Sequence, residues 1–122
     1  MDYNKKSKEI RRSILNMIFD SKSGHIGGSY SCVDILVSLF YGKNLKFNPK
    51  NPELKNRDRL IVSKGHASAA FYSILSHVGY FEKNKLKKYC SNNTILSTHL
   101  SKKVPGVEFD TGSLGHGLGV AS

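Results

Sequence analysis

The chain has 122 residues, of which 39% are hydrophobic and 23% charged, and its formal net charge is +10. These values are ordinary for one soluble globular domain with a single core. No stretch approaches the roughly 18 apolar residues of a membrane span, and the polar N-terminus leads to no apolar signal-peptide core, so neither a membrane span nor a signal peptide is expected.

The first half of the chain predicts two helices separated by a break. Residues 9–20 place Ile10, Ile14, Met17 and Ile18 on one stripe, which is typical of an amphipathic helix. Residues 20–31 contain three glycines and interrupt that helix. A second helix over 32–41 is apolar on nearly every side and is expected to be buried, with Ser31 as its N-cap, Asp34 as a capping-box-like partner and Gly42 at its end.

The second half predicts a loop over 44–58, a buried strand over 59–63 and a helix over 65–79. A short lysine-rich helix is expected around 82–90, and residues 91–111 have the pattern of a loop. Glycines between 112 and 119 open a last helix. A strand that runs directly into a helix is typical of an α/β layer fold. A single strand cannot form a sheet. Either further strands of this chain are not recognisable from the pattern, or strands from outside this segment complete the sheet.

The positive charge indicates an anionic partner: nucleic acid, acidic lipid or phosphorylated metabolites. Solvated helix faces are the favoured interpretation of the two basic clusters, because no aromatic residues alternate with the lysines as a base-stacking platform needs. Nucleic-acid binding is therefore not favoured. The clusters comprise Lys5, Lys6, Lys8, Arg11 and Arg12, and Lys83, Lys85, Lys87 and Lys88.

Two cysteines, Cys32 and Cys90, lie far apart and form no metal-ligand pattern. Two reduced thiols in a cytoplasmic protein are the simplest interpretation. The five histidines show no HxxxH or HExxH spacing, so a metal site is not favoured.

Three of the five histidines directly follow a glycine: His25, His66 and His116. With 11 glycines and 5 histidines in 122 residues, chance gives roughly 0.5 such pairs. Glycine lets the backbone turn sharply or approach a ligand, and histidine adds a donor or acceptor near neutral pH. Each pair lies where a loop enters a predicted helix, a position that favours anions. His77, inside a helix, is interpreted as structural, and spacing alone gives His99 no role.

Three segments in succession carry a resemblance to a known family: "SGHIGGSYSCVDILVSLFYG", "NPKNPELKNRDRLIVSKGHASAAFYSIL" and "STHLSKKVPGVEFDTGSLGHGLGVAS". The chain resembles the N-terminal, diphosphate-binding part of transketolase, particularly the form encoded as a separate N-terminal subunit. The resemblance implies an α/β fold, namely the helix-rich N-terminal portion of a three-layer α/β/α domain. Residues 1–122 would form an incomplete domain of that kind.

The resemblance also implies a cofactor, thiamine diphosphate, and the residues that bind it. His66 is expected near the diphosphate, where an imidazole at a helix start makes charge-assisted hydrogen bonds. A turn without a Cβ at its first residue is expected to lie against the cofactor rings. The residues of that turn are Gly112, Ser113, Leu114, Gly115 and His116.

His25 and His99 match catalytic histidines that line the substrate channel of transketolases. They are expected to bond to hydroxyls at the carbonyl end of a ketose and to assist proton transfers there. The implied reaction moves a two-carbon ketol unit between sugar phosphates. Thr98-His99-Leu100 replaces the Gly-His-Pro of many full-length transketolases, and His116 replaces a common glutamine, so the choice of substrate stays open.

The Gly-Asp-Gly segment with which this family holds Mg²⁺ is absent, and so is the pyrimidine-binding domain. The metal ligands are therefore expected outside this segment, on a C-terminal transketolase section or subunit. The partner would complete a homodimer or a heterotetramer, and the isolated chain would be inactive.

Three other functions stay open at this point. A deoxyxylulose-phosphate synthase-like enzyme is a close variant, against which the run "VPGVEFDTGSLGHG" argues. A non-catalytic phosphate-binding or interaction module of the same fold is the second, and a basic nucleic-acid binder is the third. A Gly-Asp-Gly segment in adjoining sequence would favour the enzyme, and a steep loss of nucleic-acid affinity with salt would favour the last.

Overall fold

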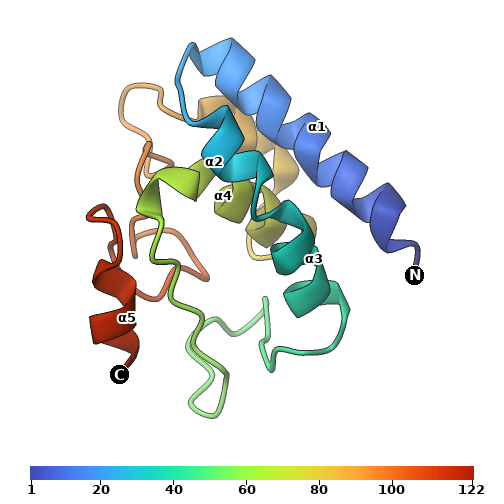
Figure 1. Ribbon diagram of the computed structural model, residues 1–122, viewed down its shortest axis with the longest axis vertical. Helices are drawn as coiled ribbons and strands as arrows, with labels where there is room; N and C mark the ends of the chain where they lie inside the picture. The colour runs from blue at the N-terminus through green and yellow to red at the C-terminus, as the bar shows by residue number, and fades with distance from the viewer.

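The computed structural model describes residues 1–122, which form helices and irregular connections without a strand. Figure 1 shows the longest helix along one side of the molecule and the last helix at the opposite edge. In chain order the elements are α1 (Tyr3–Ser21), α2 (Ile26–Tyr30), α3 (Val33–Tyr41), the 3₁₀ helix η1 (Gly65–Ala67), α4 (Ser68–His77), the 3₁₀ helix η2 (Lys83–Lys88) and α5 (His116–Ala121).

Helix α1 begins earlier than the predicted residue 9 because Asp2 caps it. The Asp2 carboxylate accepts a hydrogen bond from the backbone N–H of Lys5 at 3.0 Å. The helix ends where Lys22 adopts a left-handed conformation with φ of 54° and donates its N–H back to the carbonyls of Ile18 and Phe19. The predicted stripe of Ile10, Ile14, Met17 and Ile18 is buried, which confirms it.

The predicted N-cap of the second helix is wrong. Residues 26–30 form a short helix, α2, inside the expected break, and Ser31 lies at its end, where its hydroxyl donates to the carbonyl of Gly28. Helix α3 starts after Cys32 with no side-chain cap. Asp34 does not take part in a capping box, because both of its carboxylate oxygens accept hydrogen bonds from Arg11 of α1, at 3.0 and 2.8 Å. This guanidinium lowers the pKa of Asp34 to about 2.

Burial of α3 is also less complete than its composition predicts. Ile35 is 63% exposed, whereas one face of the helix is buried. A helix at the edge of a single small core has only one neighbouring face, so it hides only one stripe. That stripe consists of Val33, Leu36, Val37 and Phe40.

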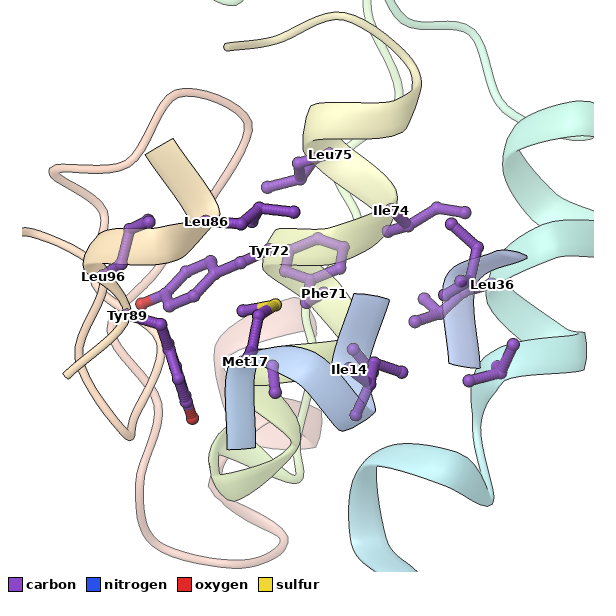
Figure 2. Close-up of a cluster of buried hydrophobic side chains, with 14 of the residues drawn as sticks. Ile14, Met17, Leu36, Phe71, Tyr72, Ile74, Leu75, Leu86, Tyr89 and Leu96 are labelled. Atoms are coloured by element: carbon purple, nitrogen blue, oxygen red, sulfur yellow. The ribbon is translucent and has the colours of Figure 1, made fainter. Parts of the chain in front are cut away.

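Helix α4 is the centre of the core. All of its residues from Ser68 to Ser76 are buried, and it contacts α1, α2, α3, η1 and η2. Figure 2 shows its large side chains between those of α1, α3 and η2. Burial of this much apolar surface is the main driving force for folding. The labelled side chains of that cluster are Ile14, Met17, Leu36, Phe71, Tyr72, Ile74, Leu75, Leu86, Tyr89 and Leu96.

The strand predicted over 59–63 does not form. The run has no extended neighbour to complete a ladder of hydrogen bonds, and a lone segment cannot make one. Leu60 and Val62 still pack against the core. The helix predicted over 65–79 forms as η1 and α4 and ends near Gly79, whose φ is +102°. The helix predicted near 82–90 is the 3₁₀ helix η2, and residues 91–111 are irregular, as expected.

One ion pair joins the two long irregular segments. The Arg57 guanidinium donates from Nε and Nη2 to the two carboxylate oxygens of Glu108, at 2.8 and 2.6 Å. The two side chains are only 10% and 16% exposed. A two-point contact of this kind holds a planar group in one orientation, so it fixes the loop before η1 against the loop before α5.

Cys32 and Cys90 are both free thiols. Burial raises the pKa of each. None of the helices is both long enough and apolar enough to pass through a membrane.

His77 occupies the position expected of a structural histidine. Its Nε2 lies 3.0 Å from the Ser13 hydroxyl of α1, and its Nδ1 is buried without a partner. Burial lowers the pKa of His77 to about 4, and the positive charges of Lys83 and Lys6 act in the same direction. The folded chain therefore holds this imidazole neutral.

We expect His77 to make the chain less stable as the pH falls. The ordinary pKa of histidine is 6.5, so between pH 6.5 and about 4 the unfolded chain binds a proton that the folded chain does not. The free energy of unfolding should fall across that range, and more shallowly in His77→Gln. Urea unfolding at pH 7, 6 and 5 measures this, with His116→Gln as the control at an exposed position. Equal pH dependence in wild type and His77→Gln would contradict it.

Candidate functional site

Three histidines from separate parts of the chain lie together on one face. The ring centroids of His25 and His66 are 5.3 Å apart, and those of His25 and His99 are 6.3 Å apart. His25 precedes α2, His66 belongs to η1, and His99 lies in the irregular segment after η2. The fold thus brings together the two predicted catalytic residues and the predicted diphosphate-binding histidine.

His25 is positioned by an unusual backbone conformation. It is the N-cap residue of α2, and its φ of 70° is in the left-handed region that few residues other than glycine adopt. Its side chain makes no cap hydrogen bond, so both ring nitrogens are available. The imidazole is exposed and lies near the rings of His66 and His99.

His66 is positioned by two close backbone approaches that require glycine. A Cβ on Gly28 would lie 2.8 Å from Nε2 of His66, so glycine there lets the ring rest on α2. A Cβ on Gly65 would overlap the carbonyl of Thr111. Glycine at both places therefore holds the His66 imidazole between α2 and the segment that enters the glycine turn.

The charge state of His66 follows from its surroundings. Burial lowers its pKa, and the nearby charges of His25, Lys64 and His99 lower it further. The lowered pKa favours the neutral imidazole, which can donate a hydrogen bond from one ring nitrogen. Lys64 is itself held by a 2.8 Å hydrogen bond that its ammonium donates to the Ser31 hydroxyl. An anion at this place would raise the pKa of His66 and favour the imidazolium.

Buried hydroxyl groups of α4 fix the backbone around His99. The Tyr72 hydroxyl donates to the carbonyl of His99 at 3.1 Å and accepts from the N–H of Ser101 at 3.2 Å. The Ser68 hydroxyl donates to the carbonyl of Thr98 at 2.7 Å. Sequence analysis missed these supporting residues, and polar groups inside an otherwise apolar helix were the signal that could have indicated them.

The glycine turn lies beside His99 with its outer side open. A Cβ on Gly112 would be 3.7 Å from Cδ2 of His99, which is ordinary contact, and the residue is exposed. The inner side is held through Gly117, where a Cβ would come within 2.9 Å of both Ile61 and Ser63. The N–H of Gly117 donates to the Ser63 hydroxyl at 3.1 Å. The segment predicted as a strand thus supports the turn.

His116 is separate from the other three site histidines. The His116 ring packs edge-on against Phe109, with centroids 5.9 Å apart. The backbone N–H of His116 donates to the backbone carbonyl of Ser113. Leu114 and Leu118 are 72% and 78% exposed, so the open side of the turn is apolar. Helix α5 stands at the edge of the molecule, as Figure 1 shows.

These residues fit a ligand with a polyanionic end and an apolar ring. Imidazole donors and a helix start suit the anion, while the bare backbone at Gly112 and the Leu114 side chain suit the ring. The buried Thr111 hydroxyl, next to the turn, has no partner within the chain. No group of three or more His, Cys, Asp or Glu side chains is placed to hold a metal ion.

Comparison with protein families gives a match over nearly the whole chain. Residues 3–122 match the model described as "Transketolase, thiamine diphosphate binding domain". Curated relatives include an apulose-4-phosphate transketolase subunit of Actinobacillus succinogenes, 42% identical over 119 residues, which are 96% of this chain and 43% of that protein. The transketolase of the Baizongia pistaciae form of Buchnera aphidicola is 39% identical over 96% of this chain and 18% of its own length.

Solved structures show the same likeness. A transketolase from Leishmania mexicana superposes with a TM-score of 0.90 at 30% identity, over 97% of this chain and 18% of that one. A transketolase from Pichia stipitis in complex with sedoheptulose-7-phosphate superposes with a TM-score of 0.81 at 32% identity, over 95% and 17%. These likenesses confirm the predicted α/β class, to which this chain contributes helices alone.

The chain spans about two fifths of the subunit-type relatives and under a fifth of the single-chain transketolases that it matches. The matched range, residues 3–122, includes the histidine cluster and the glycine turn. The chain therefore belongs to the transketolase family, in which it represents thiamine-diphosphate-binding domain sequence.

Proposed function

We propose that the chain is part of a thiamine-diphosphate-dependent transketolase that moves a two-carbon ketol unit between sugar phosphates. The observation that carries the proposal is the convergence of His25, His66 and His99 beside the exposed backbone of Gly112. Two names among the relatives, a transketolase for apulose-4-phosphate and one bound to sedoheptulose-7-phosphate, support sugar phosphates as the substrate class.

Thiamine diphosphate would supply the stabilisation of a carbanion, and the chain would supply position and proton transfer. The His66 imidazole, which rests on α2 at Gly28, would donate a hydrogen bond to a diphosphate oxygen. The exposed rings of His25 and His99 would bond to substrate hydroxyls and hold or release a proton there. The turn at Gly112 would let the cofactor ring approach the backbone, and Leu114 would exclude water from its face.

The complete enzyme needs a partner segment or subunit. Mg²⁺ commonly binds proteins through one or two carboxylates together with phosphate oxygens, and we place those carboxylates on the partner. Two of the relatives are named as subunits of a transketolase, which supports a divided enzyme, and we propose a homodimer or a heterotetramer. The free thiols Cys32 and Cys90 fit a reducing compartment, and we place the enzyme in the cytoplasm.

Calorimetric titration of thiamine diphosphate with Mg²⁺, with and without the C-terminal partner, tests this function. We expect tight binding and ketol transfer in the assembled protein, and at most weak binding by the 122-residue chain. Transfer from a ketose phosphate to an aldose phosphate is measured in the same samples. An assembled protein that binds the cofactor and transfers no ketol unit would contradict the enzymatic proposal.

We expect His66→Ala to raise the dissociation constant of thiamine diphosphate about tenfold or more in the assembled enzyme, because a charge-assisted hydrogen bond is lost. His77→Gln, which removes an imidazole that contacts Ser13 of α1, should leave this constant unchanged. In wild type, cofactor binding should raise the pKa of His66, measured by NMR titration of the ring, because a nearby anion favours the imidazolium. Unchanged affinity in His66→Ala would contradict the assignment.

His25→Ala and His99→Ala should lower kcat/KM by about 10²-fold or more, as expected when a proton-transfer group is removed. Cofactor affinity, measured by calorimetry, should change little. Both side chains are exposed, so the free energy of unfolding should also be nearly unchanged. Loss of the fold in either variant would show that the histidine is structural.

Gly112→Ala and Gly112→Val should weaken cofactor binding in order of size. The nearest atom to a Cβ at this position is 3.7 Å away, which is ordinary contact, and the residue is exposed, so urea unfolding should change little. Calorimetry with thiamine diphosphate and Mg²⁺ measures the effect in the assembled enzyme. Normal binding by the valine variant would rule out close approach of the cofactor to this backbone.

A further inference from the structure

A hollow lies between η2 and the irregular segment that follows it. Its volume is about 750 Å³, and none of the predicted cofactor or catalytic residues lines it. Ligand sites for small organic molecules usually measure about 300–1,000 Å³. The hollow is therefore large enough for a ligand of that kind.

Three lysines reach this hollow from two segments. A 3₁₀ helix has three residues per turn, so Lys85 and Lys88 of η2 share one ridge, whereas Leu86 and Tyr89 share the buried one. Lys103 lines the hollow from the segment before α5.

The positive charge of the hollow is only partly balanced. Glu82 is the one acidic residue that lines it, against the three lysines. The ammonium groups of Lys85, Lys88 and Lys103 make no hydrogen bond or ion pair with the chain, whose three salt bridges involve other residues. Like charges gathered around a concave surface attract an anion to it.

The rest of the lining suits a planar apolar ring with polar edges. Phe81, Ile95 and Pro105 line the hollow with apolar side chains, and Ile95 is 45% exposed. Leu96 and Val104, which also line it, are almost fully buried. The amides of Asn92 and Asn93 stand beside this surface and can donate and accept hydrogen bonds. The segment 90–96 is closed by a hydrogen bond from the N–H of Cys90 to the carbonyl of Leu96 at 2.8 Å, so this wall is ordered.

We propose that this hollow binds a nucleoside phosphate. The lysines bind the phosphate groups, and the apolar surface and the two asparagines hold the base. This inference rests on the hollow alone and is independent of the proposed ketol transfer.

The test uses the assembled enzyme, with ADP as the probe and two double variants of equal charge. Lys85→Gln/Lys103→Gln removes two ammonium groups from the hollow. Lys83→Gln/Lys102→Gln is the matched control: Lys83 lines a different hollow of about 220 Å³ with Ser13 and Asp20, and Lys102 is the exposed neighbour of Lys103. At roughly 0.15 M salt, where exposed charges are screened, calorimetry should show ADP affinity at least about tenfold lower in the first variant and nearly unchanged in the control.

Two further measurements identify the ligand class and the place of binding. Inorganic phosphate and adenosine should each bind at least about tenfold more weakly than ADP, because each meets only half of the hollow. ADP should shift the NMR resonances of residues 91–96, and His66→Ala should leave ADP affinity unchanged.

Four outcomes would overturn the proposal. Absence of ADP binding would do so directly, and equal losses in the two double variants would show diffuse attraction by the basic surface. Phosphate binding as tight as that of ADP would remove the role of the base. A loss of ADP affinity in His66→Ala would place the nucleotide at the histidine cluster instead. Far-UV circular dichroism of each variant verifies that it is folded.

Discussion

The complete burial of α4 is the constraint on which the rest of the structure depends. Because every residue from Ser68 to Ser76 is buried, each polar group of this stretch needs an internal partner or stays unsatisfied. The hydroxyls of Ser68 and Tyr72 meet this need by bonding to the backbone at residues 98, 99 and 101. The same bonds place the His99 imidazole, so core formation and site geometry have one cause.

Close approach between backbone segments also shapes the site, at the point where α4 begins. Gly28 and Gly65 let α2, η1 and the segment before the turn pack at distances that no Cβ tolerates. The His66 ring is held in that contact, where burial keeps it neutral until an anion arrives. The inner side of the site is therefore rigid and crowded, whereas Leu114 and Leu118 leave its outer side exposed and apolar. A surface of this kind suits a site completed by a cofactor and a further protein segment.

The fold also determines the surroundings of the basic side chains. Arg11 and Lys6 of the first basic cluster are paired with Asp34 and Glu9. In η2 the three-residue turn separates lysines that look like one run in the sequence and directs them into two hollows. A cluster of like residues is thus divided into groups with different surroundings, which is why Lys83 can serve as the matched control for Lys85.

The sequence by itself determined the helical stripe of α1, the helix that follows "SKGH", the family, and the idea that Gly-His junctions carry function. These signals are local, because periodicity, the conformational freedom of glycine and ordered motifs each depend on a few neighbouring residues. They can therefore be recognised without knowing the tertiary structure. Tertiary structure decided the rest. Asp34 pairs with Arg11 instead of joining a capping box, because a guanidinium from another helix binds both oxygens. Residues 59–63 form no strand, because a ladder needs a neighbouring segment. His99 lies beside His25, whereas His116 lies beside Phe109. Sequence does not reveal this arrangement, because packing of the loops onto α4 determines which of them come together.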